Sequence, residues 1–136
     1  MRVVYYANYL IWMEMGRAEF CRAAGARYRD MEREDGVLLA VVEANCRYIA
    51  PAFYDEEVKI ETWVERAHPR MIQFAYRVLN ASDDRLLAEG YTKHIVCDRE
   101  LKPSRLPARY RPLFGVGELR RPDSSIIPAA AALEDL

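Results

Sequence analysis

The stretch VVYYANYLIWMEMGRAEFCRAAG, residues Val3 to Gly25, decides the fold because it predicts one long and unusually apolar helix. The helix is expected from about Asn8, whose side chain can cap the first turn, to Ala24, with Gly25 in the left-handed conformation that ends many helices. Apolar side chains recur at helical spacing and include Tyr9, Trp12, Met13, Gly16, Phe20 and Ala24, with Ile11, Met15 and Ala18 beside them. So broad an apolar surface predicts a helix that is buried on most sides.

The pattern changes from helix to strand after Gly36. Charged residues fill 26–36, where we expect a helix extension or a loop. Four β-rich runs follow, and two of them alternate strictly between apolar and polar side chains. The runs, which are separated by bends and turns, are Val37–Tyr48, Glu57–Glu65, Met71–Leu79 and Leu86–Asp98. Consecutive strands with short turns predict an antiparallel meander.

These elements predict a single α+β domain in which a curved antiparallel sheet wraps around one long central helix. The domain is expected over residues 1–115, with one short helix near Leu106–Phe114. Residues 116–136, with further prolines and an alanine run, are predicted to form a loose C-terminal tail.

The composition excludes several classes of protein. The net charge is −1 over 136 residues, which gives no electrostatic argument for nucleic acid. Charged residues from Glu14 onward exclude a membrane span in the apolar N-terminal stretch. Cys21, Cys46 and Cys97 lie far apart and are expected to be reduced, buried side chains in a cytoplasmic protein. His68 and His94 form no metal-binding pattern, and His94 is expected to be a hydrogen-bonded strand residue.

Three segments resemble hotdog-fold acyl-CoA thioesterases of the 4-hydroxybenzoyl-CoA thioesterase type. They are YYANYLIWMEMGRAEFCRAAG, VVEANCRYIAPAFYDEEVKIET and LLAEGYTKHIVCDRELKPSRLP. The resemblance implies the hotdog fold, an active site at a homodimer interface, and dimers that often pair into tetramers. It also implies hydrolysis of an acyl-CoA to a free acid and CoA, without a cofactor or metal.

The resemblance also implies a catalytic arrangement at the start of the helix. Backbone N–H groups at a helix N-terminus suit the oxyanion of the transition state, and the family pattern places this donor at Tyr6 or Ala7, with Asn8 beside it. The family's catalytic Asp and first strand fall before Met1. A late start codon, a short form that does not hydrolyse, and another carboxylate acting in its place are the three explanations. Glu14 is the nearest carboxylate, but a structural pair with Arg17 on the helix is favoured for it.

Two groups of residues are candidates for substrate binding. Tyr5, Tyr6, Tyr9 and Trp12 are an aromatic cluster that either packs in the core or lines an acyl pocket. Basic side chains that suit the CoA phosphates are Arg47, Lys93 and Arg105, with Arg70, Arg99 and Lys102 as further candidates. Acyl-CoA hydrolysis is the leading hypothesis. The alternatives are an acyl- or acyl-CoA-binding protein on the same fold and, less favoured because the helix lacks a histidine, a hydratase or dehydratase.

Overall fold

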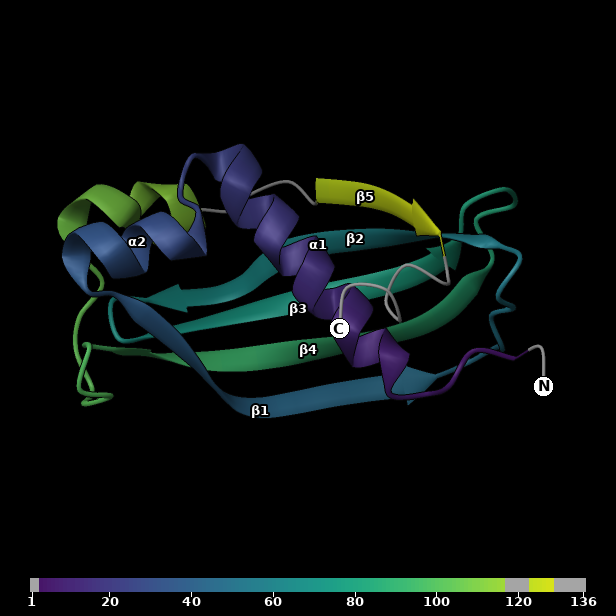
Figure 1. The fold of residues 1–136 in the computed structure, drawn as a ribbon, viewed down its shortest axis with the longest axis horizontal. Helices are drawn as coiled ribbons and strands as arrows, with labels where there is room; N and C mark the ends of the chain where they lie inside the picture. Colours follow the sequence, from purple (N-terminus) through teal and green to yellow (C-terminus); the bar gives the residue numbers. More distant parts are fainter. Residues whose placement is uncertain (1–2, 117–122, 129–136) are drawn as a thin grey trace.

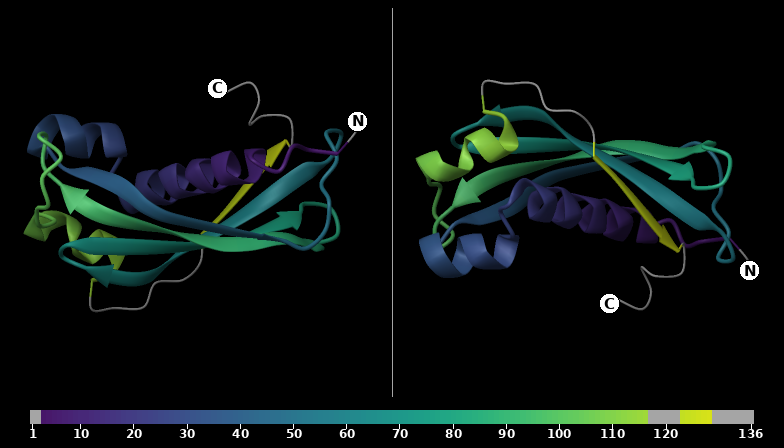
Figure 2. Two further views of the ribbon diagram at one scale, coloured as in Figure 1. Left: turned by 90° about the horizontal axis from the view of Figure 1, so that it is seen from below. Right: turned by 90° about the horizontal axis from the view of Figure 1, so that it is seen from above.

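The computed structural model describes residues 3–116 and 123–128, which form an α+β structure with one antiparallel sheet. Helix α1 crosses one face of the curved sheet, and α2 lies at one end of it (Figures 1 and 2). The helices are α1 (Asn8–Ala24) and α2 (Tyr28–Asp35), and the strands are β1 (Leu38–Tyr48), β2 (Glu57–His68), β3 (Met71–Asn80), β4 (Leu86–Cys97) and β5 (Asp123–Pro128).

The sheet has the strand order β1-β4-β3-β2-β5, and all of its neighbours are antiparallel. Strands β2, β3 and β4 follow one another through short turns, so the predicted meander is confirmed. Within the described residues β1 is an edge strand, because it pairs only with β4. Figure 1 shows β1 and β5 at opposite edges of the sheet.

Strand β5 corrects the prediction of a loose tail. Asp123–Pro128 pairs with β2 along a six-residue register, from Thr62 opposite Asp123 to Glu57 opposite Pro128. The pairing partner is remote in sequence, so the local pattern of prolines and alanines did not reveal it. The rest of the predicted tail, apart from Val116, lies outside the described residues, and the domain boundary at residue 115 stays a prediction.

The helical content also differs in detail from the prediction. Helix α1 has 17 residues and ends as expected at Gly25, whose φ of 92° is left-handed and whose N–H bonds to the carbonyl of Arg22. The charged segment 26–36 contains the separate helix α2 of 8 residues. The expected helix near Leu106–Phe114 is instead two short 3₁₀ turns, Ala108–Tyr110 and Pro112–Phe114.

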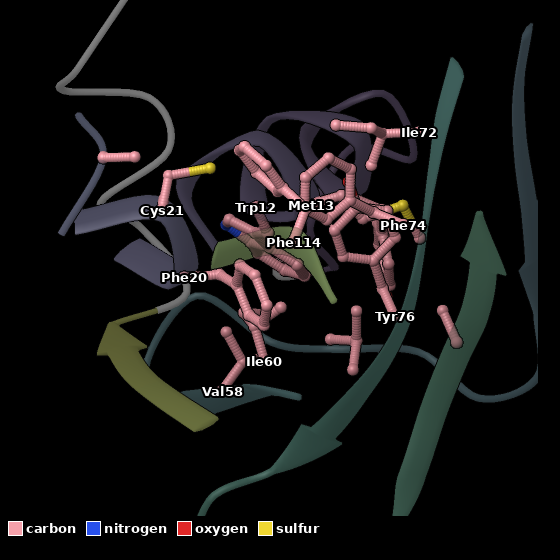
Figure 3. Close-up of a cluster of buried hydrophobic side chains, with 14 of the residues drawn as sticks. Trp12, Met13, Phe20, Cys21, Val58, Ile60, Ile72, Phe74, Tyr76 and Phe114 are labelled. Atoms are coloured by element: carbon pink, nitrogen blue, oxygen red, sulfur yellow. The ribbon is translucent and has the colours of Figure 1, made fainter. Parts of the chain in front are cut away.

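The core lies between α1 and the sheet. Trp12, Met13 and Phe20 of α1 meet the side chains that β2 and β3 direct toward the helix (Figure 3). The alternation of those strands is confirmed at the inward residues Val58, Ile60, Thr62, Ile72, Phe74, Tyr76 and Val78, which are all buried, whereas Val64, expected on the same face, is only half-buried. The outward face of α1 is less covered than predicted, because Leu10, Glu14 and Ala18 are exposed in the single chain.

Gly16 is the point of closest approach between α1 and the sheet. A Cβ atom added there would lie 2.6 Å from Oγ1 of Thr62 and 2.7 Å from Cγ2 of Ile60. Both distances are too short for carbon atoms, and the neighbours belong to a buried strand. Helix α1 therefore packs on β2 at a distance that only glycine permits.

A buried polar cluster lies further along the same interface. Arg17 is only 8% exposed, and its Nη1 donates to the hydroxyl of Tyr76 at 3.1 Å and to Oγ1 of Thr92 at 3.4 Å. The same Oγ1 lies 2.8 Å from Nε2 of His94. The guanidinium of Arg17 therefore points into the core, and the predicted structural pair with Glu14 is present only as a charge interaction between the two side chains. The prediction of a hydrogen-bonded strand histidine at His94 is confirmed.

Replacing Gly16 by Ala should destabilise the protein by about 1–3 kcal/mol, because the added methyl group forces α1 away from β2. Urea denaturation would measure the change. The matched control is Glu14→Ala, an exposed substitution in the same helix that should change stability by less than about 0.5 kcal/mol. Equal stability of Gly16→Ala and the wild type would contradict this account of the interface.

The buried His94 should make stability depend on pH. Burial, and then the charge of Arg17, lower the pKa of His94 to about 4 from an ordinary 6.5. Between these values the unfolded state binds more protons than the folded state, so stability should fall as pH drops from about 6.5 to about 4, by up to about 1.4 kcal/mol per unit. His94→Gln should flatten this slope in urea denaturation, whereas the exposed His68→Gln serves as the control. If the slope of stability against pH is unchanged in His94→Gln, groups other than His94 cause that slope.

Candidate active site

The chain is fixed to the sheet before α1 begins. The N–H of Val4 donates to the carbonyl of Ala52 at 2.9 Å, and Val3 forms a bridge with Phe53. In return, the N–H of Ala52 donates to the hydroxyl of Tyr9 at 3.1 Å. These contacts hold the first turn of α1 beside the bend that follows β1.

Three tight backbone hydrogen bonds shape the first turn of the helix. The N–H groups of Asn8, Tyr9 and Leu10 donate to the carbonyls of Tyr5, Tyr6 and Ala7, at 3.0, 3.2 and 3.2 Å. Ala7 is the N-cap residue, with φ −67° and ψ −21°, and none of the described side chains caps the helix. The predicted capping role of Asn8 is therefore wrong. Asn8 lies inside the first turn with its side chain buried.

This arrangement leaves two backbone donors at the helix start. In the part of the chain that the structure describes, the N–H groups of Tyr6 and Ala7 have no hydrogen-bond acceptor. The N–H of Asn8 is already bonded to the carbonyl of Tyr5. Free N–H groups at a helix N-terminus carry the positive end of the helix dipole and can bind an anionic oxygen. Of the three predicted catalytic residues, Tyr6 and Ala7 are thus the ones with available amides.

An apolar hollow of about 300 Å³ includes Tyr6 in its lining, together with Val3, Val4, Tyr9, Tyr48, Ile49, Ala50 and Pro51. Tyr6 is 61% exposed, and its ring meets that of Tyr48 edge-on at 6.2 Å. The ring of Tyr48 also meets that of Tyr9 edge-on, at 5.0 Å. The walls are therefore aromatic and aliphatic, which suits an apolar group.

The predicted aromatic cluster divides between this hollow and the core. Tyr6 and Tyr9 line the hollow, and the exposed Tyr5 ring stacks at a tilt on Tyr6 with centroids 4.6 Å apart. Trp12 is fully buried and packs on the ring of Tyr9 at 4.6 Å. For Trp12 the geometry favours the core-packing interpretation over the acyl-pocket one.

The basic residues predicted to bind CoA do not gather at this site. Arg47 lines a different hollow, of about 510 Å³ on the sheet face away from α1, and lies 3.9 Å from a carboxylate oxygen of Glu89. Lys93 is half-buried on β4, opposite Glu43 of β1. Arg105 is exposed after the end of β4. Their roles stay predictions.

Two carboxylates are candidate partners of the helix start, Glu56 at the bend before β2 and Glu14 within α1. Glu56 accepts from the N–H of Phe53 at 2.9 Å and from the side chain of Asn80, and it lies 3.8 Å from the guanidinium of Arg85. These contacts close the bend before β2. Glu14 is exposed two turns into α1. Among the described residues that line the aromatic hollow, none is acidic.

Sequence reasoning missed Tyr48, the last residue of β1. Its hydroxyl donates to the carbonyl of Tyr6 at 2.9 Å, so it contacts the turn that carries the free amides. The alternation of a β-strand predicts that Tyr48 lies on the same face of β1 as Cys46, and this was the one local indication of its orientation. The contact itself joins residues 42 positions apart and was not readable from the local pattern.

The described residues contain neither a cluster of metal-ligating side chains nor a membrane-spanning helix. Nowhere in 3–116 and 123–128 do three or more His, Cys, Asp or Glu side chains come together in a way that could hold a metal ion. The helices within these ranges are too short or too polar to cross a membrane.

Comparison with known proteins gives consistent results. The sequence model of a family described as the thioesterase-like superfamily matches residues 1–114. YneP of Bacillus subtilis (strain 168), whose name proposes an acyl-CoA thioesterase, is 36% identical over 84% of this chain and 79% of its own length.

Solved structures also match closely. A hypothetical protein of Thermus thermophilus, TT1821, has a TM-score of 0.78 and 32% identity, covering 84% of this chain and 85% of its own. A DHNA-CoA thioesterase of Staphylococcus aureus has a TM-score of 0.74 and 34% identity, covering 82% and 74%. The fold is therefore hotdog-like.

Proposed function

We propose an acyl-CoA thioesterase activity for this chain, which belongs to the thioesterase-like superfamily. The observation that carries the proposal is the pair of available amides, at Tyr6 and Ala7, beside an apolar hollow. Relatives that support it include the DHNA-CoA thioesterase of Staphylococcus aureus and YneP.

The amides would act on the thioester carbonyl. Water attacks this carbonyl and releases one proton to the solvent, which leaves a tetrahedral oxyanion. The oxyanion then collapses to the free acid, and the expelled CoA thiolate takes up a proton from the solvent. Two N–H donors at the start of α1, aligned with the helix dipole, stabilise the oxyanion more than the neutral carbonyl, and so lower the barrier. The acyl group would occupy the hollow between Tyr6, Tyr9 and Tyr48.

A homodimer would complete this arrangement. Strand β1 is an 11-residue edge strand, and Val41 and Val42 on it are 53% and 55% exposed. An edge of this length with exposed apolar side chains favours pairing with a second copy of itself. Such a partner would also cover the open outward face of α1 and make it the central helix of the assembly.

The first test is an assay of thiol release from a panel of aliphatic and aromatic acyl-CoAs. To probe the amide, Ala7 is replaced by its α-hydroxy analogue, lactic acid, which exchanges the N–H for an ester oxygen. Loss of one oxyanion donor should lower kcat by about 100- to 1000-fold. Because the N–H of Ala7 bonds to no described acceptor, the melting temperature should hardly change.

The matched control is the same exchange at Ala23, whose N–H belongs to the hydrogen-bond ladder inside α1. This change should lower the melting temperature and leave kcat close to that of the wild type. If the exchange at Ala7 leaves kcat unchanged, the amide is not an oxyanion donor.

A second function has one observation in its favour. Since the described lining of the hollow contains no carboxylate, the chain is also suited to bind an acyl-CoA without hydrolysing it. Binding of acyl-CoA in calorimetry, without thiol release from any member of the panel, would establish this alternative over the thioesterase.

The proposed dimer predicts the effect of charge on the β1 edge. Val42→Lys should weaken self-association, because pairing would bury the new charge. Sedimentation equilibrium would measure the dissociation constant, which should rise by at least about tenfold, or about 1.4 kcal/mol. The control is Leu101→Lys, at an exposed turn outside the edge. Equal association of both variants with the wild type would place the interface elsewhere.

A further inference from the structure

Tyr48, which was not among the predicted site residues, makes a hydrogen bond to the start of α1. Its hydroxyl donates to the carbonyl oxygen of Tyr6 at 2.9 Å, and the same oxygen accepts the N–H of Tyr9 at 3.2 Å. Two donors therefore hold one carbonyl, at the last peptide group before the N-cap Ala7.

The carbonyl of Tyr6 and the N–H of Ala7 belong to the same peptide group. This group is planar and trans, so its C=O and N–H bonds point in opposite directions. A constraint on the carbonyl is therefore a constraint on the N–H. With the carbonyl of Tyr6 directed along α1 toward Tyr9, the N–H of Ala7 points out of the N-terminal end of the helix.

Tyr48 is itself held firmly. It is the last residue of β1 and lies opposite Ala88 of β4. The next two residues, Ile49 and Ala50, both donate to the carbonyl of Leu87, at 2.9 and 3.1 Å. The ring meets those of Tyr6 and Tyr9 edge-on. The hydroxyl is thus presented to the helix start from the rigid sheet.

We propose that Tyr48 is a positioning residue, which orients and polarises the peptide group between Tyr6 and Ala7 so that the Ala7 N–H can stabilise the oxyanion. The inference rests on the proposed thioesterase function. A hydrogen bond to the carbonyl draws electron density through the peptide group and makes its N–H a stronger donor. Tyr48 does not touch the reacting atoms in this account.

The ionisation of Tyr48 suits this role. Partial burial, and then its contact with Cys46, raise the pKa of Tyr48 to about 12. The phenol stays protonated at neutral pH, and its proton remains available to the carbonyl of Tyr6.

The test is Tyr48→Phe, which keeps the ring and removes only the hydroxyl. With the acyl-CoA that the wild type hydrolyses best, kcat should fall about tenfold, which is less than the loss of a whole oxyanion donor. KM should change less than twofold and the melting temperature should stay close to that of the wild type. The amide nitrogen resonance of Ala7 should shift, because its peptide group has lost a hydrogen bond.

Tyr91→Phe is the matched control, since it removes a tyrosine hydroxyl whose partner, Glu43, lies away from the helix start. It should leave kcat and the Ala7 resonance unchanged. If the wild type is active and Tyr48→Phe has the same kcat, the inference about Tyr48 is wrong, while the proposed thioesterase function stands. A joint fall of kcat and melting temperature, or a rise in KM instead, also overturns the inference in favour of a structural or binding role. A wild type that releases no thiol from any acyl-CoA contradicts the proposed function, and the inference with it.

Discussion

The close contact between α1 and β2 at Gly16 is the constraint on which the rest of the structure depends. Without a side chain at this position, the helix rests directly on Ile60 and Thr62. This contact fixes the distance between α1 and the sheet near the middle of the helix. The large residues of α1, Trp12, Met13 and Phe20, fill the space on either side. The start of the helix is thereby brought beside the bend after β1, where Val4 and Tyr9 bond to Ala52.

The chemistry proposed for the site follows from this placement more than from the identity of its side chains. The candidate donors are backbone amides, and any residue but proline supplies one. What the sequence must provide is the surrounding geometry: an uncapped helix start, a fixed carbonyl at Tyr6 and an apolar hollow. The buried cluster of Arg17, Tyr76, Thr92 and His94 has the opposite character. Its polar side chains bond to each other inside the core, and so it contributes to the packing of α1 on the sheet.

The sequence predicted those parts of the fold that are encoded locally. The period of α1, its end at Gly25 and the alternation of β2 and β3 depend on neighbouring residues and were confirmed. The pairing of β5 with β2 and the contact of Tyr48 with Tyr6 join distant segments, and no local pattern encodes them. Arg17 was predicted to pair with Glu14 along the helix, and the sequence pattern did not show that the hydroxyls of Tyr76 and Thr92 accept hydrogen bonds from its guanidinium in the core. Asn8 has the usual chemistry of a cap, but the tight turn from Tyr5 begins the helix one residue earlier.

The two edges of the sheet differ in a way that bears on both assembly and the site. At one edge β5 is short and ends in a proline, which offers no N–H to a further strand. At the other edge β1 is long and its valines are exposed. This asymmetry favours a closed pair through β1 over continued growth of the sheet. Since Tyr48 is the last residue of β1, a partner on that edge would stiffen the strand that holds the carbonyl of Tyr6. Assembly and orientation of the Ala7 amide would then depend on the same strand.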